Sequence, residues 1–185
     1  MGVHGRMQGR ALGRSARRGG LVVGTDGSAT ATKAVEAAAR MAVTTGQPLT
    51  ITLGYRSQTA GQLASSWRDV PESERWRISP GAQGEDLVQR AVSFAREVTN
   101  DDLQVRGRCE PGDPAGVLVG VAQDVSASSV VVGNVGMRGW AQRWSVPQRV
   151  LHRARCEVLV VDTEAWARLG EPLEVPTSLM LLRVG

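Results

Sequence analysis

The stretch LVVGTDGSATATKAVEAAARMAVTTG, residues 21–46, holds the first two elements of the fold and the turn that joins them. Its first four residues are an apolar run that ends at Gly24, which is typical of a short buried strand. From Ala31 onward, small and apolar residues recur at helical spacing, and Ser28 stands before them as a natural N-cap. We therefore predict a strand, a turn with the sequence TDGS, and a helix.

Four further segments are short apolar or alternating runs of the kind that form strands. They are residues 49–55 (LTITLGY), 103–109 (LQVRGRC), 128–132 (SSVVV) and 157–161 (EVLVV). In the second of them apolar and polar residues alternate, which predicts a strand covered on one side and near a sheet edge. The last two are dominated by valine, which predicts strands buried on both faces.

Helices are predicted between these strands, two of them behind recognisable caps. Asp113 followed by Pro114 is an explicit helix start, and Ser145 with Gln148 fits the S-x-x-Q capping box. A third helix is predicted from Asp86, where apolar residues share one helical face. Strands that alternate with helices in this way predict an α/β protein with a five-stranded, mostly parallel sheet and helices on both faces.

Residues 56–85 form an unusually long polar connection, which we interpret as either a functional lid or a mobile insertion. Trp67 and Trp76 within it either pack the segment onto the domain, which we favour, or contact a partner. The C-terminal TSLMLLRV is either a short extra strand or a partner-binding segment. We predict a basic, disordered arm at residues 1–19, a domain at 20–162 and a C-terminal extension at 163–185.

The charge of the chain is concentrated in its N-terminal arm. The first twenty residues hold five of the 22 basic residues and no acid, so the remainder has 17 basic and 18 acidic residues. A nearly neutral domain does not predict specific binding to nucleic acid. No apolar stretch reaches the length that a membrane-spanning helix needs, so no membrane partner is predicted either.

The sequence predicts no metal site and no catalytic residue. Cys109 and Cys156 lack C-x-x-C spacing and are interpreted as two buried thiols in a reduced cytoplasm. His4 and His152 are too few and too far apart to suggest a metal cluster. No Walker lysine follows a glycine loop, and neither a Ser/His/Asp set nor a carboxylate cluster for magnesium is recognisable.

Two loops have the composition of a ligand site. Residues 25–28 (TDGS) and 133–136 (GNVG) each follow a predicted strand, and ligands of parallel sheets bind beyond the carboxyl ends of the strands. If the first and fourth strands are neighbours, these loops meet. Two plainer roles remain open: Asp26 as the residue that stabilises a turn, and Gly133 with Gly136 as a tight strand-to-helix turn.

Three blocks of the sequence resemble the universal stress protein family. They are LVVGTDGS, EPGDPAG and VVVGNVGMRGWAQRWSVPQRVLHRARCEVLVVDT, and in order and spacing the resemblance covers residues 20–162. It implies a Rossmann-like domain of the adenine-nucleotide alpha-hydrolase kind, located in the cytoplasm and forming a homodimer. The last strand, Glu157–Val161, is the implied dimer contact, and its apolar edge favours a cover by a second copy or by the C-terminal extension.

The resemblance also implies a binding site for ATP or AMP, with Mg²⁺. In nucleotide-binding members an Asp of the first loop contacts the nucleoside, the end of the second strand holds the adenine, and a G-x-x-G-(nine residues)-G-[ST] loop surrounds the phosphates. Asp26, the backbone of Tyr55 and Ser145 would take these three roles. The full implied set is Thr25, Asp26, Tyr55, Val132, Gly133, Gly136, Arg138, Ser145 and Val146.

The phosphate loop departs from the family pattern. Between Gly136 and Ser145 it has eight residues where the pattern has nine followed by a glycine, and Trp144 stands in the place of that glycine. Trp140 or Trp144 would fill the phosphate space, or Arg138 and Arg143 would pair with the phosphates. We predict a nucleotide-binding stress-response module with little turnover and reduced affinity for triphosphates. The alternatives are a dimeric interaction module without nucleotide and, ranked last, a slow ATPase.

Overall fold

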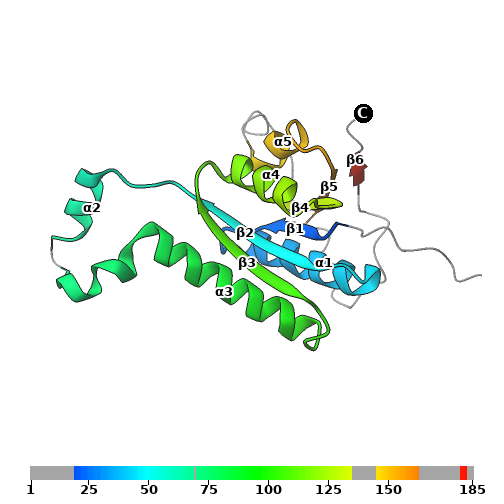
Figure 1. Cartoon of the computed structure of the whole chain (residues 1–185), viewed down its shortest axis with the longest axis horizontal. Helices are drawn as coiled ribbons and strands as arrows, with labels where there is room; N and C mark the ends of the chain where they lie inside the picture. The colour runs from blue at the N-terminus through cyan, green and yellow to red at the C-terminus, as the bar shows by residue number, and fades with distance from the viewer. Residues whose placement is uncertain (1–18, 69, 135–144, 163–179, 183–185) are drawn as a thin grey trace, which may run out of the picture.

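The computed structural model describes residues 19–68, 70–134, 145–162 and 180–182. Within them, the strands form a six-stranded sheet in the order β3-β2-β1-β4-β5-β6 (Figure 1). The first five are parallel, as predicted, and β6 is antiparallel to β5. The strands are β1 (Leu21–Gly24), β2 (Leu49–Tyr55), β3 (Val105–Pro111), β4 (Ser129–Asn134), β5 (Glu157–Asp162) and β6 (Met180–Leu182).

Helices cover both faces of the sheet, which confirms the predicted fold class (Figure 1). Helices α1 (Ala29–Thr45) and α3 (Pro80–Val98) lie on one face, and α4 (Pro114–Asp124) and α5 (Val146–Leu151) lie on the other. Alternate residues of the strands feed two separate cores: Val23 packs toward α1 and α3, and Val22 packs toward α4 and α5. Burial of this apolar surface is the main stabilising term of the fold.

Three predicted N-caps are found where the sequence placed them. Ser28 caps α1 by accepting a hydrogen bond from the Ala31 N–H at 3.2 Å, and Asp113 caps α4 by accepting one from the Gly116 N–H at 3.0 Å. At α5 the Ser145 hydroxyl accepts from the Gln148 N–H at 3.5 Å. Further along α5, Gln148 Nε2 lies 3.4 Å from His152 Nε2.

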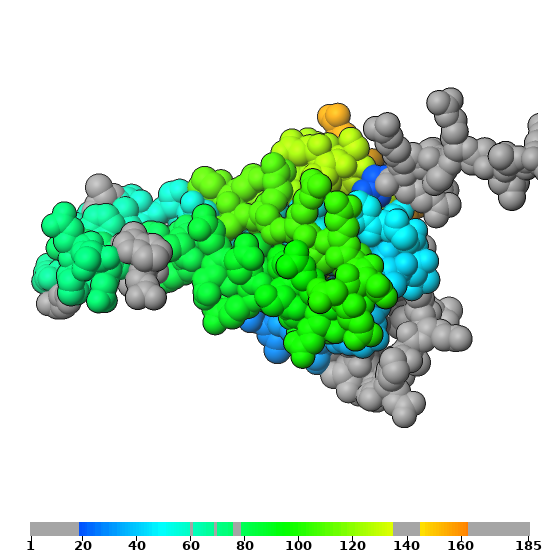
Figure 2. All heavy atoms as spheres, turned by 60° about the horizontal axis from the view of Figure 1, so that its bottom comes forward, coloured from blue at the N-terminus to red at the C-terminus, as the bar shows by residue number. Residues whose placement is uncertain are grey.

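The long connection after β2 contains helices that the sequence interpretation did not include. Helix α2 (Ala60–Ser66) and the 3-10 helix η1 (Glu72–Ile78) project from the body as a lobe beyond the carboxyl end of β2 (Figures 1 and 2). The predicted start of α3 at Asp86 is wrong, because Ser79 caps the helix and Pro80 occupies its first turn. This is the same Ser-then-Pro signal that marks helix starts elsewhere.

Trp67 packs inside this lobe. The Arg75 guanidinium lies 6.0 Å from the centre of its ring, and its indole N–H is buried without a hydrogen-bond partner in the described part of the chain. A cation placed over an aromatic ring at this distance is attracted by it. The interaction holds the end of α2 against η1, so the described contact of Trp67 is made within the lobe and not, as predicted, onto the domain. The side chain of Trp76 lies outside the described residues.

The two edges of the sheet differ. Strand β3 forms one edge, as its alternation predicted, and its residues are mostly exposed or half-buried. At the other edge β6 pairs with Val158, Leu159 and Val160 of β5. The C-terminal segment therefore supplies the short extra strand that was one of its two interpretations. The predicted basic arm and most of the C-terminal extension lie outside the described residues.

None of the described helices is long and apolar enough to cross a membrane. Cys109 and Cys156 are free thiols, as predicted, but both are half-buried rather than buried. Burial raises the pKa of both thiols above the ordinary value, and nearby glutamates raise it further. Both side chains are therefore neutral at neutral pH, and neither has the depressed pKa of a reactive cysteine.

Candidate functional site

Residues 25–28 and the described part of the second predicted loop, Gly133 and Asn134, meet at the carboxyl edge of the sheet, where Gly133 and Asn134 form the end of β4 rather than a loop. Strands β1 and β4 are hydrogen-bonded neighbours, with Val23 opposite Val131, so their carboxyl ends lie side by side. These segments border a cavity of about 330 Å³, a size within the usual range of small-ligand sites. Its lining comprises Gly24, Thr25, Asp26, Ser28, Thr30, Ala31, Thr52, Gly54, Pro114, Leu118, Val132, Gly133, Asn134, Ser145, Val146 and Pro147.

Most of the site residues implied by the resemblance lie together in this lining. They come from the end of β1, the end of β4 and the start of α5: Thr25, Asp26, Val132, Gly133, Ser145 and Val146. Gly136 and Arg138 lie outside the described residues, as do Trp140, Arg143 and Trp144 of the shortened loop. Tyr55 is described but does not line the cavity.

Tyr55 is occupied by contacts on the opposite face of the sheet. Its carbonyl accepts a hydrogen bond from the Gly112 N–H at 2.8 Å, and its hydroxyl oxygen lies 3.1 Å from the place where a Cβ of Gly81 would stand. Gly54, the residue before it, lines the cavity in its place. At the end of β2 the residue that lines the cavity is therefore Gly54, one residue before the position that the resemblance implied.

Asp26 is an exposed residue that stabilises the turn after β1. Its Oδ1 accepts a hydrogen bond from the Ser28 N–H at 2.9 Å, and the Thr25 hydroxyl accepts one from the Gly27 N–H at 3.2 Å. Gly27 has a φ of 78°, a value that favours glycine. The turn role weighed for Asp26 is therefore present, and it places the carboxylate at the cavity wall.

Gly133 is required by close packing. A Cβ at this position would lie 3.0 Å from the Thr30 carbonyl oxygen and 3.2 Å from the Ala34 Cβ. Because the first of these atoms belongs to the backbone of α1, it cannot rotate away. The glycine lets the end of β4 approach the first turn of α1, and both segments line the cavity.

The sequence interpretation missed lining residues on β2 and α4. Thr52, Gly54, Pro114 and Leu118 all face the cavity, which lies on the α4 side of the sheet. The alternation of β2 was the signal that could have located them, because side chains of a strand point to its two faces in turn. Leu49, Ile51 and Leu53 point into the core beneath α1 and α3. The even-numbered residues of β2 therefore face α4.

An ion pair next to the cavity joins α4 to α5. The Asp113 carboxylate pairs with the Arg149 guanidinium, and Arg153 Nη1 lies 3.7 Å from the same oxygen. The Arg149 hydrogen bond is the largest cause of a pKa below the ordinary 3.8 at Asp113. The pair holds the residue before Pro114 against the helix that begins with Val146, so it positions two walls of the cavity.

We expect Asp113→Asn to remove a stabilisation that depends on pH. Because the pKa of the folded-state carboxyl is lowered, its stabilisation is fully present above pH ~4 and is lost as pH falls through the folded-state pKa. Asparagine keeps the N-cap, so at pH 7 the loss should be below about 1 kcal/mol for this partly exposed pair. Thermal melts from pH 7 to pH 3 measure the difference, which should shrink toward zero in acid. A constant difference would contradict the assignment.

The described lining residues offer hydrogen-bond donors to an anion and a single carboxylate. They contain no group of three or more His, Cys, Asp or Glu side chains that could hold a metal ion. Asp26 is the one carboxylate among the described lining residues. Backbone N–H groups at the start of α1 and the hydroxyls of Ser28 and Ser145 offer hydrogen bonds to an anion, and the helix dipole favours negative charge there.

Comparison with known proteins agrees with this geometry. Universal stress protein Rv1636 of Mycobacterium tuberculosis is 32% identical over 145 residues, which cover 77% of this chain and 95% of that protein. A crystal structure of a universal stress protein in complex with cAMP is 31% identical, with a TM-score of 0.62, over 80% of this chain and 99% of that one.

The universal stress protein UspA from Lactobacillus plantarum shares the fold at 18% identity, with a TM-score of 0.58 over 78% of this chain and 99% of that one. The family model described as the Universal stress protein family matches residues 20–162, from the start of β1 to the end of β5. The chain therefore belongs to the universal stress protein family.

Proposed function

We propose that this protein is a regulatory module that binds an adenine nucleotide with one phosphate, cAMP or AMP, with little or no turnover. The observation that carries the proposal is the cavity in which Asp26, Gly133 and Ser145 surround one space at the carboxyl edge of the sheet. The 31% identical relative solved with cAMP supports the same class of ligand.

The chemistry of the lining supports an assignment of its parts. The base would lie at Gly54 and Leu118, where the wall is apolar, and the ribose hydroxyls would donate to the second oxygen of Asp26. The phosphate would lie at the first turn of α1, near Ser28 and Ser145. Gly133 would bring its backbone close to the phosphate, as the resemblance implies for the family.

ATP is proposed to bind more weakly than a monophosphate. The shortened loop with Trp144 in the place of a glycine supports this, because a large side chain there takes space from the outer phosphates. Among the described lining residues Asp26 is the single carboxylate, so a magnesium ion would be held chiefly by the phosphates of the nucleotide. We therefore propose that Mg²⁺ binds only together with ATP.

Isothermal titration of the full chain with cAMP, AMP and ATP, with and without Mg²⁺, tests the proposal. We expect cAMP or AMP to bind and ATP to bind less tightly. Asp26→Ala should raise the dissociation constant at least about tenfold, the effect of losing a hydrogen bond to a charged group. Asp102→Ala is the matched control, because Asp102 is also an exposed aspartate in a turn but lies before β3, at the other edge of the sheet.

Two results would overturn the proposal. If none of the three nucleotides gives a heat of binding, the site is not a nucleotide site and the interaction-module alternative takes its place. If ATP is hydrolysed above the protein-free background and Asp26→Ala removes that hydrolysis, the protein is an enzyme rather than a binding module.

The homodimer and the cytoplasmic location implied by the resemblance stay part of the proposal. Strand β6 lies along Val158–Val160, so a second copy at this edge would have to displace β6 or exchange it with its partner. The molar mass from light scattering on the full chain tests this point. A monomer at all concentrations would assign the edge to β6 alone.

A further inference from the structure

Strand β3 is an open edge of the sheet. It pairs with β2 on one side, and no described residue pairs with its other side, whereas β6 lies along β5 at the opposite edge. Arg106, Gly107 and Pro111 of this strand are exposed. An open edge presents unpaired backbone N–H and C=O groups to which another strand can add. The edge of β3 is therefore a surface on which a further strand could pair.

The hydrogen bonds to β2 show which backbone groups of β3 point outward. The Gln104 carbonyl accepts from the Leu49 N–H at 2.9 Å, and the Gly112 N–H donates to the Tyr55 carbonyl at 2.8 Å. Residues of a strand turn their backbone groups alternately toward one neighbour and the other. Because Gln104 and Gly112 both face β2, the odd-numbered residues between them face outward. The outward groups are the N–H and C=O of Val105, Gly107 and Cys109 and the C=O of Pro111.

Charged side chains follow this edge on the α4 side of the sheet. Arg106, Arg108 and Glu110 point to this side, because the residues that alternate with them, Val105 and Cys109, pack into the core beneath α3. The Arg106 side chain is exposed and makes no hydrogen bond or ion pair with the described residues. A charged edge discourages pairing with a strand that does not compensate the charge. A strand that fits β3 must therefore supply an acid opposite Arg106.

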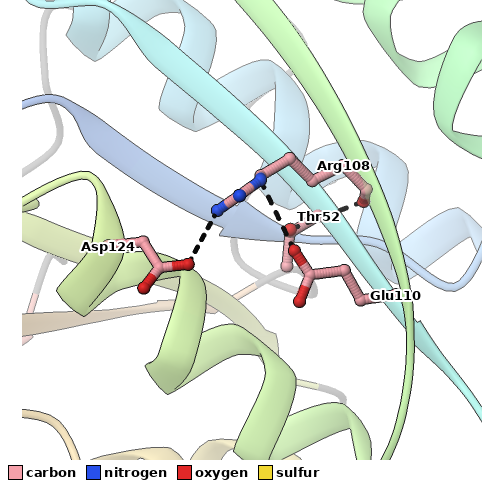
Figure 3. Close-up of polar contacts among 4 residues, drawn as sticks. All are labelled: Thr52, Arg108, Glu110 and Asp124. Carbon is pink, nitrogen blue, oxygen red and sulfur yellow. Dashed lines mark hydrogen bonds and ion pairs between the residues drawn. The ribbon is translucent and has the colours of Figure 1, made fainter.

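Arg108 differs from Arg106 because its charge is neutralised within the chain. Its guanidinium pairs with Asp124 at 3.1 Å and with Glu110 at 3.4 Å (Figure 3). Its carbonyl accepts a hydrogen bond from the Thr52 hydroxyl at 3.5 Å. The side chain extends toward α4, which packs over β2, and so it points away from the open edge (Figure 3). Glu110 uses Oε1 in this pair, which leaves its second oxygen to accept a hydrogen bond from another chain.

We propose that β3 is a self-association surface, on which two copies of this chain pair antiparallel about a two-fold axis at Arg108. A two-fold interface brings residue i against residue j and residue j against residue i. Arg106 of each copy then faces Glu110 of the other, so opposite charges meet twice across the strands. Gly107 of each copy faces Cys109 of the other, and the outward backbone groups of both can bond. The two Arg108 side chains face each other at the axis, where each is already paired with acids of its own chain.

Other positions of the axis fit less well. The outward groups of the two copies must face each other, so the axis can move only by a whole residue. An axis at Gly107 would place Arg106 against Arg108 of the other copy, and like charges would oppose each other. An axis at Cys109 would place Arg106 against Gly112, without an acid. The axis at Arg108 alone compensates Arg106, and it also pairs the full length of β3 with itself.

This surface lies at the edge opposite to Glu157–Val161, the dimer contact that the resemblance implied. It goes beyond the proposed function and does not depend on nucleotide binding. The association is expected to be weak, because a pair of seven-residue strands buries less surface than a standard protein interface.

Sedimentation velocity of the full chain, from about 1 µM to about 1 mM, tests the proposal. The mass should rise reversibly from that of one chain to that of two and stop there, because a two-fold interface is closed. Arg106→Glu places two carboxylates opposite each other at both ends of the interface, so it should raise the dissociation constant of the dimer at least about tenfold. The charge swap, Arg106→Glu with Glu110→Arg, should recover most of this loss. Arg155→Glu is the matched control, because Arg155 is an exposed arginine directly before β5, away from β3.

The other outcomes overturn the proposal. A wild-type chain that stays monomeric over the whole range has no such surface. A dimer that Arg106→Glu leaves unchanged, or that only Arg155→Glu weakens, forms elsewhere than at β3. If the charge swap recovers none of the loss in Arg106→Glu, the two residues do not face each other and the register is wrong. Circular dichroism melts show whether each variant is folded at the temperature of the measurement.

Discussion

Substitution of Gly84 by valine is expected to lower the free energy of unfolding by about 3 kcal/mol, the upper part of the range for overpacked cores. Gly84 is a buried residue of α3 that faces β2 and β3. A Cβ there would lie 2.6 Å from Cys109 Sγ and 3.1 Å from Leu53 Cδ2. The helix would have to move away from the sheet, and buried contacts of Val88 and Val92 would be lost with it. Urea unfolding followed by circular dichroism measures the effect.

Gly120→Val is the matched control for this prediction. It makes the same substitution on α4, the helix of the other face, where nothing lies within 4 Å of the added Cβ. The stability of this variant should change by less than about 0.5 kcal/mol, since valine has a better helix propensity than glycine. In the Gly84 variant, Cys109→Ala should recover part of the loss, because it removes the nearest clash. Equal stabilities of the two glycine variants would contradict the packing argument.

The fold could be predicted from the sequence because its elements carry local signals. The apolar run before Gly24 and the valines of residues 130–132 mark buried parallel strands. In α1, apolar residues recur at helical spacing directly after the N-cap. Such signals lie within a few residues of each other, so they are readable without tertiary information. The edge position of β3 was readable for the same reason, since its alternation reports burial on one side.

The helices of the lobe after β2 were not predicted, because their helix-start signals are short and the polar composition of the segment is that of a loop. Residues 56–85 are polar, and a polar segment of this length suggests a loop. The capping box of Thr59 and Gln62 starts α2, and Ser79 with Pro80 starts α3 six residues before the predicted position at Asp86. The apolar face that marks a core helix is absent at these points, because the lobe projects from the body (Figure 1).

The sequence located the residues at the rim of the candidate site but not those at the base of its cavity. Asp26 lies in a loop with recognisable composition and Gly133 at the end of a valine-rich strand, so the sequence located both. Thr52 and Leu118 lie inside regular elements, and their place in the cavity follows only from the pairing of β2 with β1 and the approach of α4. The pair of Asp113 with Arg149 joins residues far apart in sequence, and charge alone does not indicate which of many arginines is the partner.

If the proposed function holds, substitution of Gly133 by valine is expected to raise the dissociation constant of the proposed adenine nucleotide about 100-fold or more, which corresponds to about 2.7 kcal/mol. The Cβ alone would stand 3.0 Å from the Thr30 carbonyl oxygen and 3.1 Å from the Thr30 Cγ2. The two methyl groups of valine would add to this contact, so the end of β4 and the first turn of α1 must separate. Both line the cavity, so their separation would displace groups on two sides of the proposed ligand at once.

A graded series separates this effect from unfolding. Gly133→Ala meets its neighbours at 3.0 to 3.2 Å, distances that a shift of a few tenths of an ångström relieves, so its affinity should lie between those of wild type and valine. Titration with cAMP or AMP gives the affinities, and circular dichroism melts show that each variant is folded at the titration temperature. Gly24→Ala, which also lines the cavity but would contact the end of the Leu118 side chain at 3.3 Å, should have a smaller effect. A folded valine variant with wild-type affinity would show that the approach of β4 to α1 does not set the shape of the site.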